Sequence, residues 1–442
     1  MRFLATLLLV LLAAPAHAVS IQEVASKNGI KAWLVEDHKL PLVAMRFAFR
    51  GGVEQDPADR QGLANLTVNM LTQGAGAYDA AAFQQELADH SIQMSFDANR
   101  DALLGGLKTL KEEQGKAFEL LRLALTQPRF DTTELERQRG QQLAALRFQL
   151  GNPEWQARYA LFQQIFGTHP YGSRRLGSTE SLARITRDDI ASFAAQHLAR
   201  SNLIIAVAGD ITGDELVQLL DQTFGALPEH AALTPMTDVV WPKIPATILV
   251  SREGTQTNML FALPGPKRDN PDWHAAEIAN YILGGGGFSS RLMQDVRDKE
   301  GLTYGIATSL SPMDYGGVLA GETAVDNPQA GKAWARILET MRRFYEDGAS
   351  EKELAAAKDY LTGALPLTMT STDKIAAILV ALQLDGQSRD YLNQHSQLVR
   401  RVTAEDVRRV IQRWFNPAGL TLSLAGQPEG IVPTVTKDLV RD

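Results

Sequence analysis

The chain of 442 residues is 45% hydrophobic and 21% charged, as folded globular proteins usually are, and its length predicts two or more domains. It contains no cysteine, which excludes disulfides and thiolate metal sites. Its net charge of −7, without a basic run, argues against a nucleic-acid partner. Beyond the first residues no apolar segment approaches transmembrane length, so no membrane anchor is expected.

The amino-terminal segment has the layout of a secretory signal peptide. Arg2 precedes an apolar run from Phe3 to Ala14, and Ala16-His17-Ala18 follows as a small-residue cleavage motif. This pattern predicts a signal peptide over residues 1–18 and cleavage before Val19. The mature protein is then exported and soluble, most simply periplasmic. An uncleaved anchor is the alternative, which the shortness of the apolar run disfavours.

The stretch GLANLTVNML, residues Gly62–Leu71, predicts an amphipathic helix with a polar pair. Asn65 and Asn69 are four residues apart and therefore share one helix face. Two histidines at this spacing would hold a metal ion, but amides are poor zinc ligands. Without further context the two side chains are simply exposed amides on a helix.

An internal repeat divides the chain into halves. Residues Ile185–Asp210 resemble Val402–Gln427, and a second pair of segments repeats upstream of these at nearly the same spacing. The matching residues are Thr186, Asp189 and Gly209 with Thr403, Asp406 and Gly426, and Glu134, Leu135 and Gly167 with Glu353, Leu354 and Gly386. The repeat predicts homologous domains over 19–232 and 246–442, joined by a linker at 233–245.

Both halves follow one order of elements. Strands over 30–52 and 246–265 lead into helices at 62–71 and 275–283, then come further strands and a long helical stretch. Each half closes with a Thr/Asp-started helix and an apolar strand, at 202–210 and 420–426. Strands and helices in this mixed order indicate α+β domains. Two such domains are expected to face each other across a cleft.

The second half carries the most informative segment, Leu283–Ile306. Four glycines, Gly284 to Gly287, allow unusual backbone angles or a close approach to a ligand, and Phe288 follows them. We expect Ser289 or Ser290 to cap a helix that buries its apolar positions and stops at Gly301, with a strand resuming immediately afterwards. The apolar positions are Leu292, Met293 and Val296.

Arg297 and Tyr304 lie on either side of that turn, where both side chains can point the same way. Both residues also have purely structural interpretations. Arg297 can stabilise a helix C-terminus electrostatically, and Tyr304 can be a half-buried strand residue. A phosphate-binding loop is disfavoured because the Lys-Ser/Thr pair of a P-loop is missing. Another stretch, His274–Ile278, comes close to a metal motif through His274 and Glu277, but it fits a solvated helix start better.

The duplicated halves, the stretch Phe166–Thr186 and the glycine-Arg-Tyr segment together resemble the inverzincin metallopeptidases. This family includes pitrilysin, insulin-degrading enzyme and mitochondrial processing peptidase. The resemblance implies that Arg297 and Tyr304 contact substrate and assist at a zinc site in the first domain of the same chain or of a partner. It also implies that Gly284–Gly287 and Phe288 guide the peptide.

The family binds zinc through H-x-x-E-H on a helix and a more distant glutamate. Aligned with that motif, Asn65 and Asn69 occupy the histidine positions and Val68 the general-base position. Ala145, or a close neighbour, occupies the position of the third ligand. The resemblance therefore implies that this chain has no zinc site of its own.

These observations lead to one main expectation and one alternative. The main expectation is a zinc-free subunit of a heterodimeric periplasmic peptidase, paired with a homologous zinc-bearing chain and acting on peptides or unfolded proteins. Arg297 and Tyr304 would then serve the partner's zinc site. The alternative is an inactive scaffold or peptide-binding protein of the same fold. A pure scaffold has no need for both the arginine and the tyrosine, which favours the first.

Overall fold

The computed structural model describes residues 20–439, so the expected signal peptide and its cleavage site lie outside the described residues. The first half forms a six-stranded sheet in the order β1-β2-β6-β3-β5-β4. Within it only β2 and β6 pair in parallel. The strands are β1 (Gln22–Ala25), β2 (Lys31–Glu36), β3 (Leu42–Arg50), β4 (Gln93–Ala98), β5 (Ala102–Leu110) and β6 (Leu203–Gly209).

The second half repeats this sheet in the order β12-β7-β11-β8-β10-β9. Five strands correspond one to one, while the sixth comes from opposite ends of the chain: β1 precedes its sheet and β12 follows its own. The strands are β7 (Thr247–Ser251), β8 (Gln256–Pro264), β9 (Ile306–Met313), β10 (Gly316–Asp326), β11 (Thr421–Gly426) and β12 (Val435–Lys437). The prediction of two homologous α+β domains is confirmed.

The α-helices follow the predicted order as far as β6 and β11, but α8 lies beyond the strand that was expected to close the first half. In the first half they are α1 (Leu63–Met70), α2 (Ala80–Asp89), α3 (Gln114–Thr126), α4 (Thr132–Gly151), α5 (Pro153–Phe166), α6 (Thr179–Arg184), α7 (Arg187–His197) and α8 (Gly213–Phe224). In the second half they are α9 (Trp273–Asn280), α10 (Ala330–Asp347), α11 (Glu351–Thr368), α12 (Thr372–Leu384), α13 (Tyr391–Arg401) and α14 (Ala404–Trp414). None of the helices in 20–439 is long and apolar enough to cross a membrane.

The repeated sequence signals form the same local structures in both halves. Thr186 caps α7 and Thr403 caps α14, each through a reciprocal capping box with an aspartate three residues on. Gly209 and Gly426 end β6 and β11 with φ of 128° and 152°, a backbone conformation that favours glycine. The repeat in the sequence therefore reflects a repeat of helix starts and strand ends.

A second shared device lies inside each sheet. Phe47 on β3 pairs with Gly105 on β5, and Phe261 on β8 pairs with Gly321 on β10. A Cβ atom at either glycine would lie about 2 Å from the partner ring, at 2.0 Å and 2.1 Å respectively. Each phenylalanine thus lies flat over a glycine on the neighbouring strand, which buries the ring within the sheet surface.

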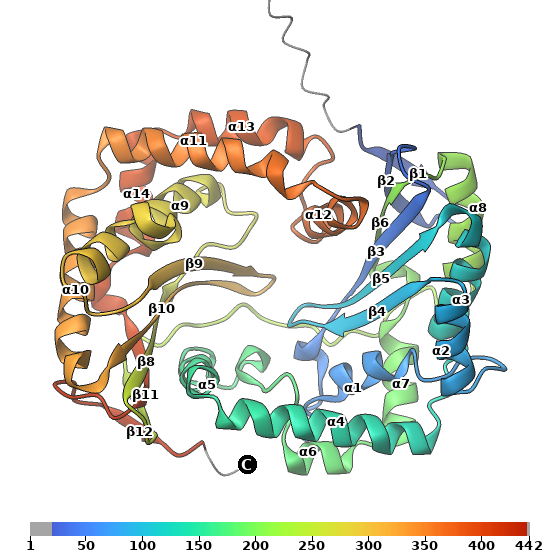
Figure 1. The fold of residues 1–442 in the computed structure, drawn as a ribbon, viewed down its shortest axis with the longest axis horizontal. Helices are drawn as coiled ribbons and strands as arrows, with labels where there is room; N and C mark the ends of the chain where they lie inside the picture. The colour runs from blue at the N-terminus through green and yellow to red at the C-terminus, as the bar shows by residue number, and fades with distance from the viewer. Residues whose placement is uncertain (1–19, 440–442) are drawn as a thin grey trace, which may run out of the picture.

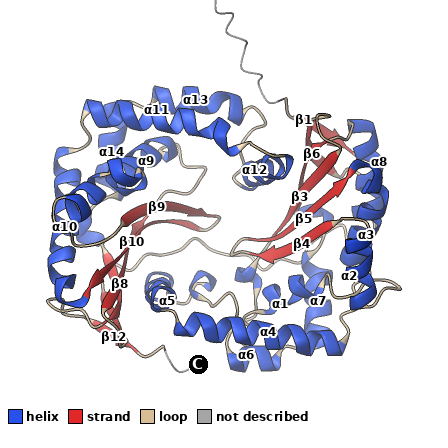
Figure 2. Cartoon of the chain, in the orientation of Figure 1, coloured by secondary structure: helices blue, strands red, loops and turns tan. Residues whose placement is uncertain are grey.

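The two halves exchange one helix each, as Figure 1 shows. Helix α5 of the first half packs on β7, β8 and β11 of the second, with Leu161 and Ile165 buried against Ile248 and Leu260. Helix α12 of the second half packs on β2, β3 and β6 of the first. Other helices cover the outer face of each sheet, so both sheets face the space between the halves (Figure 2).

The halves also meet at a hairpin tip near the centre of the molecule. Asp314 lies in the β9–β10 turn, and its carboxylate forms an ion pair with the Arg50 guanidinium at 3.2 Å. The backbone N–H of Asp314 donates a hydrogen bond to the Asp101 carboxylate at 3.4 Å. The Tyr315 N–H donates to the Tyr171 hydroxyl at 3.1 Å. The segment that joins the halves, from the end of α8 to β7, runs across the surface without regular secondary structure. These contacts fix the halves against each other.

Candidate functional site

Helix α1 carries the predicted degenerate motif on a buried face. Asn65 is 6% exposed and Val68 is 1% exposed, whereas Asn69 is half buried. The helix begins after Gly62, whose φ of 93° is left-handed. The Asp56 carboxylate takes the place of a capping side chain, since it accepts hydrogen bonds from the Gly62 and Ala64 N–H groups at 2.7 Å each.

Asn65 is bonded to Gln142 on α4, which lies outside the motif predicted from the sequence. Its amide nitrogen donates to the Gln142 side-chain oxygen on α4 at 3.2 Å. The Gln142 amide nitrogen donates in turn to the carbonyls of Gly62 and Leu176, at 3.1 Å and 3.0 Å. The structure thus places Gln142 opposite Asn65, whereas Ala145, which was expected with its close neighbours at the third position, is exposed.

These residues do not fit a zinc ion. The position holds two amides, a buried valine and a glutamine, so it offers no imidazole, carboxylate or thiolate. A hydrogen bond joins Asn65 of α1 to Gln142 of α4 instead, so amides join the helices where the family joins them through a metal. Valine cannot accept a proton from water, and this constellation therefore supports no zinc-dependent hydrolysis.

The glycine segment extends α9 rather than forming a loop. Residues Tyr281–Gly285 continue the helix as a π-helical turn. A Cβ at Gly284 would lie 2.5 Å from the Thr308 hydroxyl oxygen on β9, and one at Gly286 would lie 2.7 Å from the Tyr281 carbonyl. Gly287 alone combines a left-handed φ of 57° with open space. Gly284–Gly286 thus allow close packing within the chain.

The segment after the glycines differs from the expected capped helix. The Ser289 and Ser290 hydroxyls donate to the Gly286 and Gly287 carbonyls at 2.8 Å and 2.7 Å instead of capping. A π-helical segment, Met293–Asp298, follows them. As expected, Leu292, Met293 and Val296 are buried and Gly301 ends the segment with φ of 63°.

Arg297 and Tyr304 both reach solvent. Arg297 lies in the last turn, over the Phe288 ring at 4.9 Å, and forms an ion pair with the neighbouring Asp298. Tyr304 is not on a strand, because β9 begins at Ile306; it lies in the preceding loop and is 90% exposed. Phe288 is 67% exposed. The side chains of Phe288 and Arg297, which are in contact, and of Tyr304, seven residues after Arg297, are here called the Arg-Tyr surface.

The Arg-Tyr surface borders a cavity on the inner face of the second sheet. Gly287 and Gly305, next to Phe288 and Tyr304, line this cavity of about 380 Å³. Glu322 on β10 and Glu154 on α5 also line it, and Arg158 bridges them with contacts of 2.6 Å and 3.0 Å. A helix of the first half therefore lines a cavity that also contacts Gly287 and Gly305, the chain neighbours of Phe288 and Tyr304.

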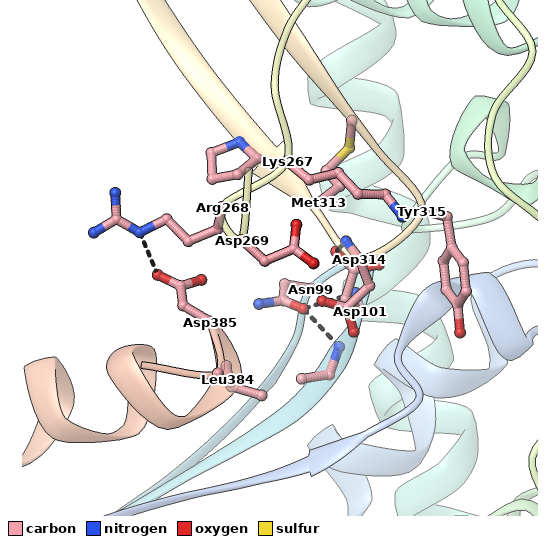
Figure 3. Close-up of a pocket in the computed structure, with 13 residues that line it drawn as sticks. Asn99, Asp101, Lys267, Arg268, Asp269, Met313, Asp314, Tyr315, Leu384 and Asp385 are labelled. Atoms are coloured by element: carbon pink, nitrogen blue, oxygen red, sulfur yellow. Dashed lines mark hydrogen bonds and ion pairs between the residues drawn. The ribbon is translucent and has the colours of Figure 1, made fainter. Parts of the chain in front are cut away.

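A larger cavity of about 510 Å³ lies between the halves (Figure 3). Its lining joins the β4–β5 turn, the loop after β8, the β9–β10 turn and the end of α12. Charged side chains dominate it, with Arg268 bound to Asp385 at 3.1 Å. Burial raises the pKa of Asp101, which accepts a hydrogen bond from the Tyr171 hydroxyl. The expected cleft between the domains is present.

Buried acids also lie beside α1. Glu54 is 3% exposed, and burial, with the nearby charge of Asp101, raises its pKa to about 8. Its carboxylate accepts a hydrogen bond from the Gly52 N–H at 2.8 Å. Burial likewise raises the pKa of Asp56 to about 7. The hydrogen bonds that its carboxylate accepts from backbone N–H groups lower this pKa, but by less than burial raises it.

His274 lies at the start of α9, as predicted, but its side chain is only 16% exposed rather than solvated. Its ring nitrogen Nδ1 is 2.9 Å from the Glu277 carboxylate, and its ring stacks on Tyr391 of α13 with centroids 6.0 Å apart. His395 of the same helix lies beside it, with ring centroids 5.7 Å apart. Local sequence patterns do not predict this contact, because His395 is far from His274 along the chain.

Comparisons with known proteins agree with this geometry. Residues 31–178 match the insulinase family (peptidase family M16), and residues 184–361 match the peptidase M16 inactive domain. The non-peptidase homolog YmxG of Helicobacter pylori is 28% identical over 368 residues, which is 83% of this chain and 84% of that protein. An uncharacterized zinc protease YmxG of Bacillus subtilis is 22% identical over 394 residues, 88% and 94% of the two chains.

Solved structures share the fold throughout. A Pseudomonas fluorescens structure described as a peptidase M16 inactive domain superposes with a TM-score of 0.87 and 28% identity, over 94% of this chain and 99% of that one. A protease from Helicobacter pylori superposes with a TM-score of 0.83 at 17% identity, over 92% and 99%. With both family domains matched in order, the chain belongs to the M16 (insulinase) peptidase family, as a homologue in which the zinc-binding motif is degenerate.

Proposed function

We propose that this chain is the zinc-free subunit of a two-chain exported peptidase, in which Arg297 and Tyr304 act on peptide held at a partner's zinc site. The observation that carries the proposal is the Arg-Tyr surface. Tyr304 is 90% exposed and Phe288 67%, an unusual exposure for two aromatic side chains in one short segment. A protein that had kept only its scaffold would be free to replace them with small polar residues.

The chemistry of the pair suits a developing oxyanion. A guanidinium and a phenol hydroxyl both donate hydrogen bonds, and neither requires a metal in the same chain. Removing one such donor typically slows an enzyme by about 10²–10³-fold. Zinc in the partner would supply the Lewis acid and the activated water. Of the glycine segment, Gly287 and Phe288 are the residues open to a peptide.

The test is reconstitution with a homologous chain that carries H-x-x-E-H. The pair should cleave an unfolded protein or a fluorogenic peptide, and each chain alone should not. Arg297→Ala should cut kcat of the pair by about 10²–10³-fold while the pair still co-elutes in gel filtration. Arg342→Ala, at an exposed helix arginine paired only with glutamates, is the matched control and should leave activity unchanged. Undiminished activity of the Arg297 variant would refute the assigned role.

The hydroxyl of Tyr304 allows a finer test. Tyr304→Phe removes only the donor, so it should lower kcat of the pair and leave KM nearly unchanged. The exposure of the side chain predicts a change in unfolding free energy within about 0.5 kcal/mol. If no homologous zinc-bearing chain yields activity, and peptides still bind, the alternative of an inactive peptide-binding scaffold is favoured.

Export forms a separate part of the proposal. The amino-terminal pattern predicts that the mature chain begins at Val19. Amino-terminal sequencing of the native protein, together with fractionation of the cells, measures this directly. A chain that retains Met1 in the cytoplasmic fraction would overturn the periplasmic assignment without touching the assignment of Arg297 and Tyr304.

A further inference from the structure

Two helices of the second half bring three metal-ligating side chains together. His274 and Glu277 are on α9, and His395 is on α13. One ring nitrogen of each histidine and one carboxylate oxygen all lie within 4.8 Å of one another. Among residues 20–439 this is the only group of three or more such side chains at that spacing.

The spacing within α9 matters because residues three apart share a helix face. His274 and Glu277 therefore present a nitrogen and an oxygen side by side, 2.9 Å apart. The other Glu277 oxygen lies 3.5 Å from the Arg268 guanidinium, which also binds Asp385 at 3.1 Å and donates to the Tyr391 hydroxyl at 3.0 Å. Arg268 thus orients the Glu277 carboxylate, and the Asp385 carboxylate balances the positive charge of Arg268.

His395 supplies an independent observation. Its side chain is buried, with 9% of the residue exposed, and its Nδ1 atom has no hydrogen-bond partner. Buried ring nitrogens are nearly always bonded, so an unpartnered one requires an explanation. The rings of His274 and Tyr391 flank His395, with centroids 5.7 Å away in each case. A metal ion bound through Nδ1 would satisfy the nitrogen that the protein leaves unpartnered.

We propose that His274, Glu277 and His395 form a binding site for a divalent transition-metal ion, of which zinc is the probe we would use. Two imidazoles and one carboxylate suit zinc and its first-row neighbours, whereas calcium and magnesium prefer oxygen ligands alone. Metal–ligand bonds of about 2.0–2.2 Å in a tetrahedral site place the ligand atoms about 3.3–3.6 Å apart. The ligand atoms of the cluster lie within 4.8 Å of one another, so the widest pair needs to close by at most about 1.5 Å.

The site is distinct from the degenerate motif on α1 and does not depend on the proposed function. It lies in the opposite half and joins α9 to α13, and Arg268 links it to the end of α12. A bound ion would hold these helices together, and with three protein ligands it would leave one position for water. Its effect is therefore expected on stability rather than on hydrolysis.

The test uses the full mature chain without a histidine tag, freed of metal by a chelator that is then removed. Zinc chloride titrated into it should bind at one ion per chain in calorimetry and raise the unfolding temperature. His395→Ala and Glu277→Gln should each weaken binding by more than about 100-fold, beyond the 10- to 100-fold lost when a supporting hydrogen bond is removed. His230→Ala, at an exposed histidine, should bind as the wild type does.

Two further measurements test whether the variants fold and whether the zinc binds at this cluster. Unfolding temperatures of the metal-free variants separate misfolding from loss of the site, and Glu277→Gln, at a partly exposed position, is the milder variant. Asn65→Ala should retain full zinc affinity, which would separate this site from α1. Absence of one-to-one binding, or binding unchanged in both His395→Ala and Glu277→Gln, would overturn the proposal.

Discussion

The region between the first long strand and the following helix is built differently in the two halves. After β3 the first half places a buried acid, Glu54, and then a helix whose polar side chain Asn65 is tied to Gln142 by neutral amides. Equally far beyond the end of β8, the second half places a cation, Arg268, followed by a helix with a histidine and a glutamate.

The strands and their supports did not diverge in this way. Both sheets keep the phenylalanine over glycine, α7 and α14 keep the Thr/Asp capping box, and β6 and β11 end in a glycine with positive φ. Backbone geometry fixes these positions, since few residues can replace them. Helix faces that line a site carry no such constraint. The duplicated architecture thus persists while the chemistry of each half changes.

The largest effect should come from the feature the halves share. Phe47→Ala and Phe261→Ala each remove a fully buried ring from above a glycine, so each should lower the free energy of unfolding by about 3–5 kcal/mol. Denaturant unfolding followed by circular dichroism measures both. Similar values for the two variants would support equivalent sheets. If only one of the two variants lowered the free energy of unfolding, the two sheets would share their strand order but not the energetic role of this phenylalanine.

The next prediction concerns variants that restore the zinc ligands missing from the first half. Combining Asn65→His, Val68→Glu, Asn69→His and Gln142→Glu rebuilds the ligand set on α1 and α4, and it should raise zinc affinity by at least about 100-fold. The measurement is competition with a chelating dye, made in a His395→Ala background so that the second half does not contribute.

The matched control replaces Gln142→Glu by Ala145→Glu in the same combination. Ala145 is exposed, whereas Gln142 faces Asn65, so only the first combination completes the site. Equal zinc affinity for the two combinations would contradict the placement of Gln142 as the third position.

A smaller effect should follow from breaking the amide contacts alone. Gln142→Ala leaves the Leu176 carbonyl and the Asn65 amide without their partner and removes one of two donors to the Gly62 carbonyl, which keeps the Leu66 N–H, so the free energy of unfolding should fall by about 1–3 kcal/mol. The exposed neighbour Arg147 is not in this network, and Arg147→Ala should stay within about 0.5 kcal/mol. Thermal and denaturant unfolding provide the values; a loss below 0.5 kcal/mol for Gln142→Ala would show that water replaces these bonds.

The pH dependence distinguishes the buried acid of the first half. The pKa of Glu54 is raised to about 8 in the folded chain, so between about pH 4.5 and 8 the folded state holds a proton that the unfolded state has lost. The contribution of Glu54 to stability is therefore complete below pH 4.5 and declines as pH rises, by up to about 1.4 kcal/mol per pH unit. Glu54→Gln should flatten this slope in unfolding experiments, and Glu112→Gln, at an exposed position, should not.

The sequence predicts most of the fold because its signals are local. Capping boxes at Thr186 and Thr403, and apolar strands such as Leu203–Gly209, form wherever their own neighbours allow. The candidate sites depend on contacts between distant segments, which local patterns do not encode. Asn65 meets Gln142, and His274 meets His395, only after the helices have packed.

At Tyr304 the local sequence pattern makes a wrong prediction. Its surroundings in the sequence predict a strand, but a turn of backbone after Gly301 delays β9 until Ile306 and leaves the tyrosine in solvent. Periodicity alone does not locate the first residue of a strand, because the hydrogen bonds of the neighbouring strand decide it. Here the pairing of Ile306 with Thr323 on β10 sets that boundary.

The exchange of α5 and α12 restricts how the molecule can open. Each of these helices covers a sheet of the opposite half with apolar side chains, so swinging the halves apart would expose both of those sheet faces to water. A hinge of the kind that clamshell proteins use is therefore costly here, and either half expressed alone would present an uncovered apolar surface. Access for a large molecule must come from movement of loops and turns, or from a surface presented to another chain, while the enclosing frame stays rigid.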